Sequence, residues 1–158
     1  MPKFSFKKVE ELTFVTFYFE GIIDESFSLS NLKSHPNKAV KVDCQKITSI
    51  NSMGIRNWIL WINSNPKVKY TFTNCPVCII EQINAVKGFI PSKSIIESFD
   101  VPYFSETTGE EKHVLYELKK DFRPGKNPTI KSVKDSTGMK MELDVAPQKY
   151  FKFLVKGI

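Results

Sequence analysis

The sequence predicts an α/β protein: a mixed β-sheet with helices packed on one face, followed by a small β-rich extension that ends in a helix. Three observations predict this class. The chain contains 13 Phe among 158 residues, and aromatic residues favour the half-buried surfaces of sheets. Residues 39–87 have the order strand, helix, strand, helix, which is typical of parallel strands joined by helical crossovers. Beyond Gly88, short strand-like runs replace the helical periodicity.

Two strands are predicted at the start of the chain. Residues 4–8 alternate Phe with polar residues, and residues 12–20 are rich in aromatic and β-branched side chains. The glutamate pair between these runs predicts a hairpin turn. Residues 26–32 are expected to form a short helix, which ends before the His-Pro-Asn sequence at 35–37.

The middle of the chain predicts two strand–helix pairs. Residues 39–44 read as a compact strand, residues 47–50 as a loop, residues 68–73 as the next strand and residues 76–86 as a helix. The first helix carries one apolar stripe with the spacing i, i+3, i+4 and i+7, formed by Ile55, Trp58, Ile59 and Ile62. Trp61 lies beside this stripe, so we expect it to be partly buried, with a partner-facing position as the alternative.

We expect two units, residues 1–101 and residues 102–158. The expected strands from the boundary onward are 94–104, 114–118, 130–133 and 139–143. A terminal helix at 147–154 begins with Pro, which suits an early helical position.

The composition excludes several classes of function. The net charge is +6, but residues 1–101 carry 12 basic and 9 acidic side chains and residues 102–158 carry 11 and 8. This even distribution, with only two Arg, argues against a nucleic-acid partner. No apolar run approaches the roughly 20 residues that a membrane-spanning helix needs. Three cysteines do not suit a disulfide framework, so we expect a cytoplasmic protein with no membrane partner.

Two short segments indicate the function. Residues 21–24 read Gly-Ile-Ile-Asp after an early strand, and residues 40–55 lead from a strand through Asn-Ser-Met-Gly-Ile into a helix. Together they resemble the STAS family of bacterial anti-sigma-factor antagonists, and the likeness covers residues 9–105. The resemblance implies a non-catalytic regulatory module in signalling, whose partner is an anti-sigma-type regulator or a kinase.

The resemblance also implies site residues. Ser52 matches the serine that the family phosphorylates, Gly54 matches its glycine, and Asp24 matches an aspartate near that serine. Asn51 stands where the family has aspartate, and Met53 replaces its second hydroxyl residue. The implied partner-binding residues are Asp24, Asn51, Ser52, Met53, Gly54 and Ile55.

Two interpretations of Ser52 follow from its position before a helix. Either Ser52 or Asn51 can be a structural N-cap, whose side chain accepts a backbone N–H. A phosphate on Ser52 would instead be tolerated by the positive end of the helix and would add up to about two negative charges to a partner-facing loop.

The extension resembles the zinc-ribbon-like hairpin pair that follows the sheet in many bacterial STAS-like proteins. The resemblance uses Asn74-Cys75-Pro76 and residues 81–84, 102–103, 141–144 and 147–151. Such ribbons hold zinc with two Cys-x-x-Cys knuckles, whereas the knuckle positions here are Ser105, Thr108, Lys134 and Thr137. We therefore expect the extension to keep the two-hairpin shape without a bound metal. Its expected core consists of Phe104, Leu115, Ile130, Leu143 and Phe151.

Other functions remain as alternatives. Cys75 and Cys78 follow a strand and open a helix, so a thiol–disulfide oxidoreductase is the first alternative. A structural subunit that forms a homodimer through its extension is the second. His35 and His113 offer no nucleophile–base pair, and with Cys44 they are too scattered for a zinc site. No glycine-rich phosphate loop occurs, so we predict no catalytic residue, metal or cofactor.

Overall fold

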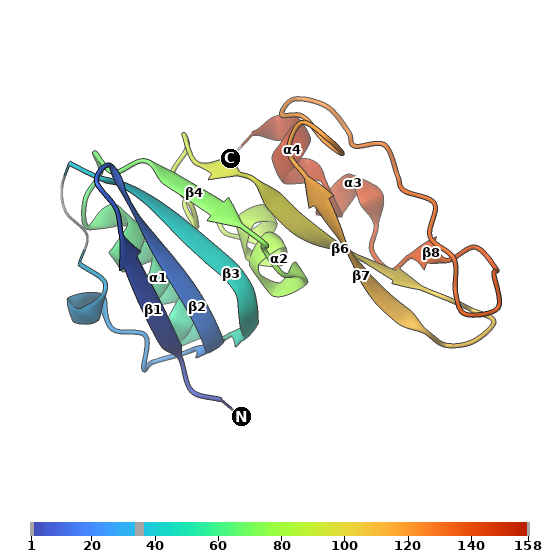
Figure 1. Ribbon diagram of the computed structural model, residues 1–158, viewed down its shortest axis with the longest axis horizontal. Coiled ribbons are helices and arrows are strands. Elements are labelled where there is room, and N and C mark those ends of the chain that lie inside the picture. Colours follow the sequence, from blue (N-terminus) through green and yellow to red (C-terminus); the bar gives the residue numbers. More distant parts are fainter. Residues whose placement is uncertain (1, 34–36, 158) are drawn as a thin grey trace.

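The computed structural model describes residues 2–33 and 37–157, and it contains two β-sheets with helices (Figure 1). His35 and Pro36 of the expected turn lie outside the described residues. The elements, in chain order, are β1 Ser5–Glu10, β2 Phe14–Ile23, the 3-10 helix η1 Leu29–Asn31, β3 Ala39–Ile50, α1 Ser52–Asn63, β4 Tyr70–Thr73, α2 Val77–Ala85, β5 Ile95–Ile96, β6 Ser98–Phe104, β7 Glu111–Glu117, β8 Glu142–Leu143, α3 Pro147–Tyr150 and α4 Lys152–Lys156.

The first sheet is mixed and has the order β1-β2-β3-β4-β5. β1 and β2 form the predicted antiparallel hairpin, and β2 to β5 pair in parallel. α1 connects β3 to β4, and α2 lies between β4 and β5 in the chain, as parallel neighbours require. The mixed α/β class is therefore confirmed.

One face of the first sheet is buried by α1, which lies behind the sheet in Figure 1. Phe17 and Phe19 of β2 are buried, whereas Tyr18 between them is 45% exposed on the opposite face. Trp58 and Trp61 of α1 both contact the Phe19 ring, with centroid distances of 5.9 and 5.4 Å. Trp61 is fully within the core and donates its indole N–H to the Leu32 carbonyl.

Several expected elements differ from the structure. Residues 130–133 form none of its named strands, the expected strand 139–143 is reduced to β8, and the expected terminal helix is divided into α3 and α4. β3 continues through Ile50, so residues 47–50 are strand and not loop; its pairing with β2 contains two register shifts. The expected helix at 26–32 is a single 3-10 turn. The expected strand at 94–104 is divided into β5 and β6, which belong to different sheets.

The extension contains the second sheet, with the antiparallel order β7-β6-β8. Its core differs from the expected one, because Phe151 is buried but Ile130 is 44% exposed, and Phe104, Leu115 and Leu143 are only half-buried. The inward positions of β6 and β7 are taken by other residues, because a strand's alternate side chains face opposite sides. These are Phe99, Val101, Tyr103 and Tyr116.

The two sheets share one continuous hydrophobic core. The start of α2 lies between them: the Cys75 N–H donates to the Ser98 carbonyl at 3.1 Å, and the Asp100 N–H donates to the Cys75 carbonyl at 2.9 Å. The expected boundary after Val101 falls inside β6.

Candidate functional site

The two segments that carry the family resemblance meet at one edge of the first sheet. β2 and β3 run parallel, with Ile23 paired to Ile50, so both strands end at this edge. The Asn51 N–H then donates to the Ile23 carbonyl at 3.1 Å. Residues 21–24 and 51–55 are therefore neighbours in space, directly at the first turn of α1.

Gly54 makes this approach possible. It is buried in the first turn of α1, and a Cβ atom at this position would lie 2.0 Å from the Ile23 carbonyl oxygen. Real Cβ atoms do not come this close to a backbone oxygen, so any side chain here would push α1 away from the end of β2. Gly54 is thus a packing residue that sets the geometry of the site.

Asn51 is the N-cap of α1. Its Oδ1 accepts the Gly54 N–H at 2.8 Å, and its Nδ2 donates to Glu25 Oε2 at 3.4 Å. Ser52 is the first helical residue and is exposed. Within residues 2–33 and 37–157, its hydroxyl has no hydrogen-bond partner. Because Asn51 already caps the helix, the Ser52 hydroxyl is not needed for the fold.

Asp24 belongs to the turn that follows β2 at this edge. Its Oδ1 accepts the Ser26 hydroxyl at 2.5 Å and the Ser26 N–H at 2.9 Å. These two hydrogen bonds lower the pKa of the Asp24 carboxyl. The carboxylate is therefore a turn-forming group that points to Ser26, and the structure shows no bond from it to Ser52.

The exposed side of α1 adds two residues, Arg56 and Leu60, that were not predicted from the sequence. Met53 is 45% exposed and Leu60 is 50% exposed, and Arg56 is exposed between them. Spacings of three, four and seven residues place such side chains on one helix face. Ile55, in contrast, is half-buried and packs against the core. We call Ser52, Met53, Arg56 and Leu60 the α1 face.

The cysteines lie together in the core rather than at this edge. Cys44 and Cys75 are fully buried and Cys78 is half-buried. Burial, reinforced by a hydrogen bond with Cys75, raises the pKa of the Cys44 thiol well above its usual value. Burial also raises the pKa of Cys78 to about 11, although an exposed thiol at a helix start would be activated.

These thiols should react slowly in the folded protein. At pH 8 we expect Ellman's reagent to modify Cys78 slowly, because its raised pKa leaves little of the reactive thiolate. Cys44 and Cys75 should react only after denaturation, because burial shields them from the reagent. Stopped-flow absorbance with and without guanidinium measures both rates. Rapid native reaction of Cys75 and Cys78, with formation of a disulfide between them, would instead support the oxidoreductase alternative.

In the extension, three of the four positions matched to zinc knuckles join a hydrogen-bond network around one carboxylate. Asp135 is buried, and its Oδ2 accepts the Ser105 hydroxyl at 2.5 Å. Its Oδ1 accepts from the Thr137 hydroxyl, the Thr137 N–H and the Met139 N–H at 2.6, 2.9 and 3.0 Å. The Thr108 N–H donates to the Ser105 hydroxyl at 3.1 Å. The side chain of Lys134 takes no part in this network, which we call the Asp135 network.

These hydrogen bonds lower the pKa of Asp135 to about 2, the Ser105 hydroxyl being the largest cause. A carboxyl with a lowered pKa stabilises the fold above its unfolded pKa of roughly 4 and loses this contribution as the pH falls through the folded value. We therefore expect the urea midpoint of the wild type to fall more steeply between pH 4 and about 2 than that of Asp135→Asn. Asp144→Asn, at an exposed site, is the control; parallel curves for all three proteins would contradict the expectation.

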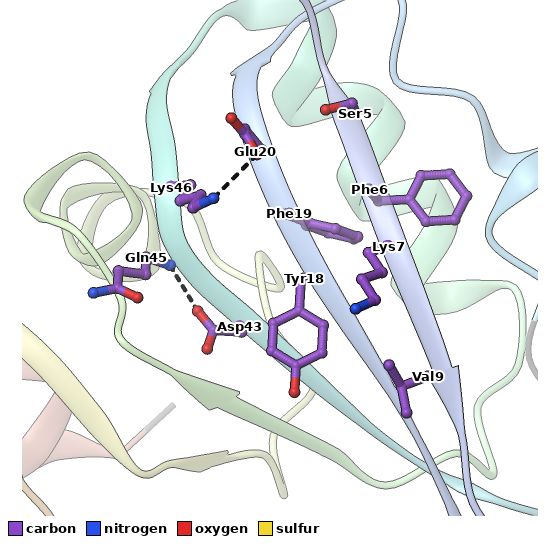
Figure 2. A pocket seen from close by; sticks show the side chains of 10 residues that line it. All are labelled: Ser5, Phe6, Lys7, Val9, Tyr18, Phe19, Glu20, Asp43, Gln45 and Lys46. Carbon is purple, nitrogen blue, oxygen red and sulfur yellow. Dashed lines mark hydrogen bonds and ion pairs between the residues drawn. The ribbon is translucent and has the colours of Figure 1, made fainter.

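The open face of the first sheet contains a shallow cavity of about 460 Å³ (Figure 2). Tyr18 lies at its centre, between Lys7 on β1 and Asp43 on β3. Three of its four charged side chains have partners: Lys46 pairs with Glu20 at 3.5 Å, and Asp43 accepts from the Gln45 N–H at 3.0 Å and from Asn74 Nδ2 at 3.1 Å. We assign no chemistry to this cavity.

The described residues were also searched for a histidine pair, a metal-ligand cluster and a membrane-spanning helix. His113 lies in β7 beside Asp100, with 4.0 Å between Nδ1 and Oδ2. In the described part of the chain, no three His, Cys, Asp or Glu side chains converge as metal ligands would. No described helix combines the length and apolar character needed to cross a bilayer.

The chain was also compared with known proteins. In these comparisons, no protein-family model and no curated protein matches the chain.

Proposed function

We propose that this protein is a non-catalytic, regulatory protein-binding module of the anti-sigma-factor-antagonist type, and that it binds its partner through the α1 face and the Asp24 turn. One observation carries the proposal. The two segments that resemble the STAS family are joined by the Asn51–Ile23 hydrogen bond of 3.1 Å, and they leave the Ser52 hydroxyl exposed where α1 begins.

The chemistry around Ser52 suits a switch by phosphorylation. A phosphate there would sit at the positive end of a 12-residue helix, where an anion gains about 0.3–1 kcal/mol. Arg56 lies one turn further on the same face, within the i, i+4 spacing that allows an ion pair. Glu25, which accepts from Asn51 at 3.4 Å, opposes the phosphate. The modification would thus change the surface charge without unfolding α1.

The α1 face also offers apolar contact area. Met53 and Leu60 are large side chains that are about half exposed, and flexible Met side chains adapt well to protein partners. Arg56 between them supplies a cation of the type that is enriched in interfaces. We propose an anti-sigma-type regulator or a kinase as the partner, and this choice follows from the family resemblance.

The test compares binding by matched variants. Purified candidate kinases or anti-sigma-type regulators from the same genome are titrated against the wild type, Leu60→Asp and Ser52→Asp by biolayer interferometry. Leu60→Asp should weaken binding at least about tenfold, since it places an unpaired charge in the interface, and Ser52→Asp should change the affinity. Ile130→Asp and Ser132→Asp, at exposed sites in the extension, should bind as the wild type does.

One outcome would overturn the proposed interface, and a second measurement tests the switch alone. Equal loss of binding in Leu60→Asp and Ile130→Asp would show that the α1 face is not the interface. Mass spectrometry of the native protein tests the switch separately, because a Ser52 that is unmodified under every growth condition removes the phosphorylation step but leaves constitutive binding intact.

A further inference from the structure

A second surface, away from the α1 face, has the features of a ligand site. A groove of about 530 Å³ lies between β5, the segment 118–125 and α4. This volume falls within the range of roughly 300–1,000 Å³ that small-molecule sites occupy. Apolar side chains form most of its wall, namely Ile95, Ile96, Phe122, Phe153, Leu154 and Val155. We call it the C-terminal groove.

Two apolar side chains in this groove are left facing solvent. Ile95 is 50% exposed on the edge strand β5, and Val155 is 43% exposed on α4. Phe153 and Leu154 are buried beneath them. Apolar side chains that gather in a concave surface, instead of being scattered singly, mark a surface that another apolar group covers.

A polar atom in the same groove lacks a partner. Ser94 lines the groove, and its hydroxyl oxygen is the only buried side-chain N or O atom in the described residues without a hydrogen bond. Buried hydroxyls are almost always paired, because an unpaired one costs about 1–3 kcal/mol. The oxygen is covered in this conformation, so the Ser94 side chain has to turn toward the groove before an acceptor oxygen on a bound molecule can satisfy it.

The charge of the groove has one sign. Among the described residues that line it, Lys156 is the only charged one. Arg123 and Lys126 line a neighbouring cavity, and Phe122 lines both that cavity and the groove. The nearby Asp121 is neutralised by Lys131 at 2.9 Å. The groove therefore suits a ligand that is apolar along its length and anionic at its end.

We propose that the C-terminal groove binds a linear acyl chain with a terminal carboxylate, the chemistry of a medium- or long-chain fatty acid. The chain lies against Ile95, Phe122 and Val155. The carboxylate meets Lys156 and accepts from Ser94, which line the groove where the end of α4 comes beside the start of β5 (Figure 1). Acyl binding here does not depend on partner binding at α1.

Calorimetry with a series of carboxylates tests the apolar part. Octanoate, decanoate and dodecanoate are titrated below their micelle concentrations. Each added methylene should tighten binding about fourfold until the groove is full, since a buried methylene contributes about 0.8 kcal/mol. Ile95→Lys should weaken dodecanoate binding at least about tenfold. Ile130→Lys is the matched control, because Ile130 is similarly exposed at 44% and lies outside the groove.

The head group is tested with the same chain length. Lys156→Gln should weaken dodecanoate about tenfold, the loss expected for one charge-assisted hydrogen bond, and leave dodecanol unchanged. Lys149→Gln, at an exposed site outside the groove, should have no effect on either ligand. Circular dichroism confirms that each variant is folded.

Three results would overturn the proposal. Dodecylammonium that binds as tightly as dodecanoate would exclude an anionic head, and equal binding by Ile95→Lys and Ile130→Lys would exclude the groove. A dimer that forms in the absence of any fatty acid and is lost in Ile95→Lys would assign the groove to a second copy of the chain.

Discussion

Replacing Trp58 with Ala is expected to cost about 3–5 kcal/mol of unfolding free energy, the range for removing a large aromatic side chain from a core. Trp58 is fully buried; it stacks on Phe89 with a centroid distance of 5.0 Å and lies 5.9 Å from Phe72. The total free energy of unfolding of a small domain is only about 5–15 kcal/mol. This single change should therefore leave the protein near its unfolding threshold.

Two matched variants separate packing from hydrogen bonding at this site. Trp58→Phe keeps most of the apolar contact but leaves the Phe89 carbonyl, which accepts from the indole N–H at 2.8 Å, without its donor; we expect a loss of about 1–3 kcal/mol. Leu60→Ala, on the exposed side of the same helix, should change stability by less than about 1 kcal/mol. Urea unfolding followed by fluorescence measures all three, and similar losses for Trp58→Ala and Leu60→Ala would contradict the assigned core.

Replacing Gly54 with Ala should destabilise the protein by about 3 kcal/mol, the upper end of the usual cost of overpacking. Helix propensity alone predicts the opposite, a gain of about 1 kcal/mol. The steric effect wins because the new methyl group would lie 2.0 Å from the Ile23 carbonyl oxygen, and neither backbone can move without opening the Asn51–Ile23 hydrogen bond. Denaturant midpoints at constant m-value provide the measurement.

Asn63→Ala is the control for the effect of helix propensity on the stability of Gly54→Ala. Asn63 is exposed at the end of α1, so its replacement should change stability by only a few tenths of a kcal/mol. If Gly54→Ala proved as stable as Asn63→Ala, the close approach of α1 to β2 would be wrong. Gly54→Ala should also weaken partner binding, because displacement of the first turn of α1 moves Ser52 and Met53.

Periodicity in the sequence was enough to predict the order strand, helix, strand, helix in residues 39–87. The i, i+3, i+4 and i+7 stripe placed Trp58 and Ile62 in the core, where both are buried. The end of β3 was missed for a physical reason. Cys44 and Ile47 are both buried although they are three residues apart, because the bulged pairing with β2 shifts the alternation of side chains.

The sequence predicted where the site lies along the chain, but not the hydrogen bonds that its side chains make. Sequence order placed Asn51 and Ser52 at a helix start, but which of them caps α1 depends on side-chain geometry. The Asp135 network could not be found from spacing, because Ser105 lies 30 residues away from the carboxylate that it contacts. Ile130 was wrongly placed in the core because short strands give too few residues to define which face is buried.

The hydrogen bonds that link Cys75 to β6 bear on how this protein can be divided. A fragment that ended at Val101 would keep the first sheet but cut β6 in the middle, and it would remove Tyr116, Tyr150 and Phe153, whose rings contact Phe99. The exposed Phe99 would then lie beside Cys75 and the start of α2. Expression of the first sheet alone is therefore expected to yield an aggregating fragment, and binding studies call for the whole chain.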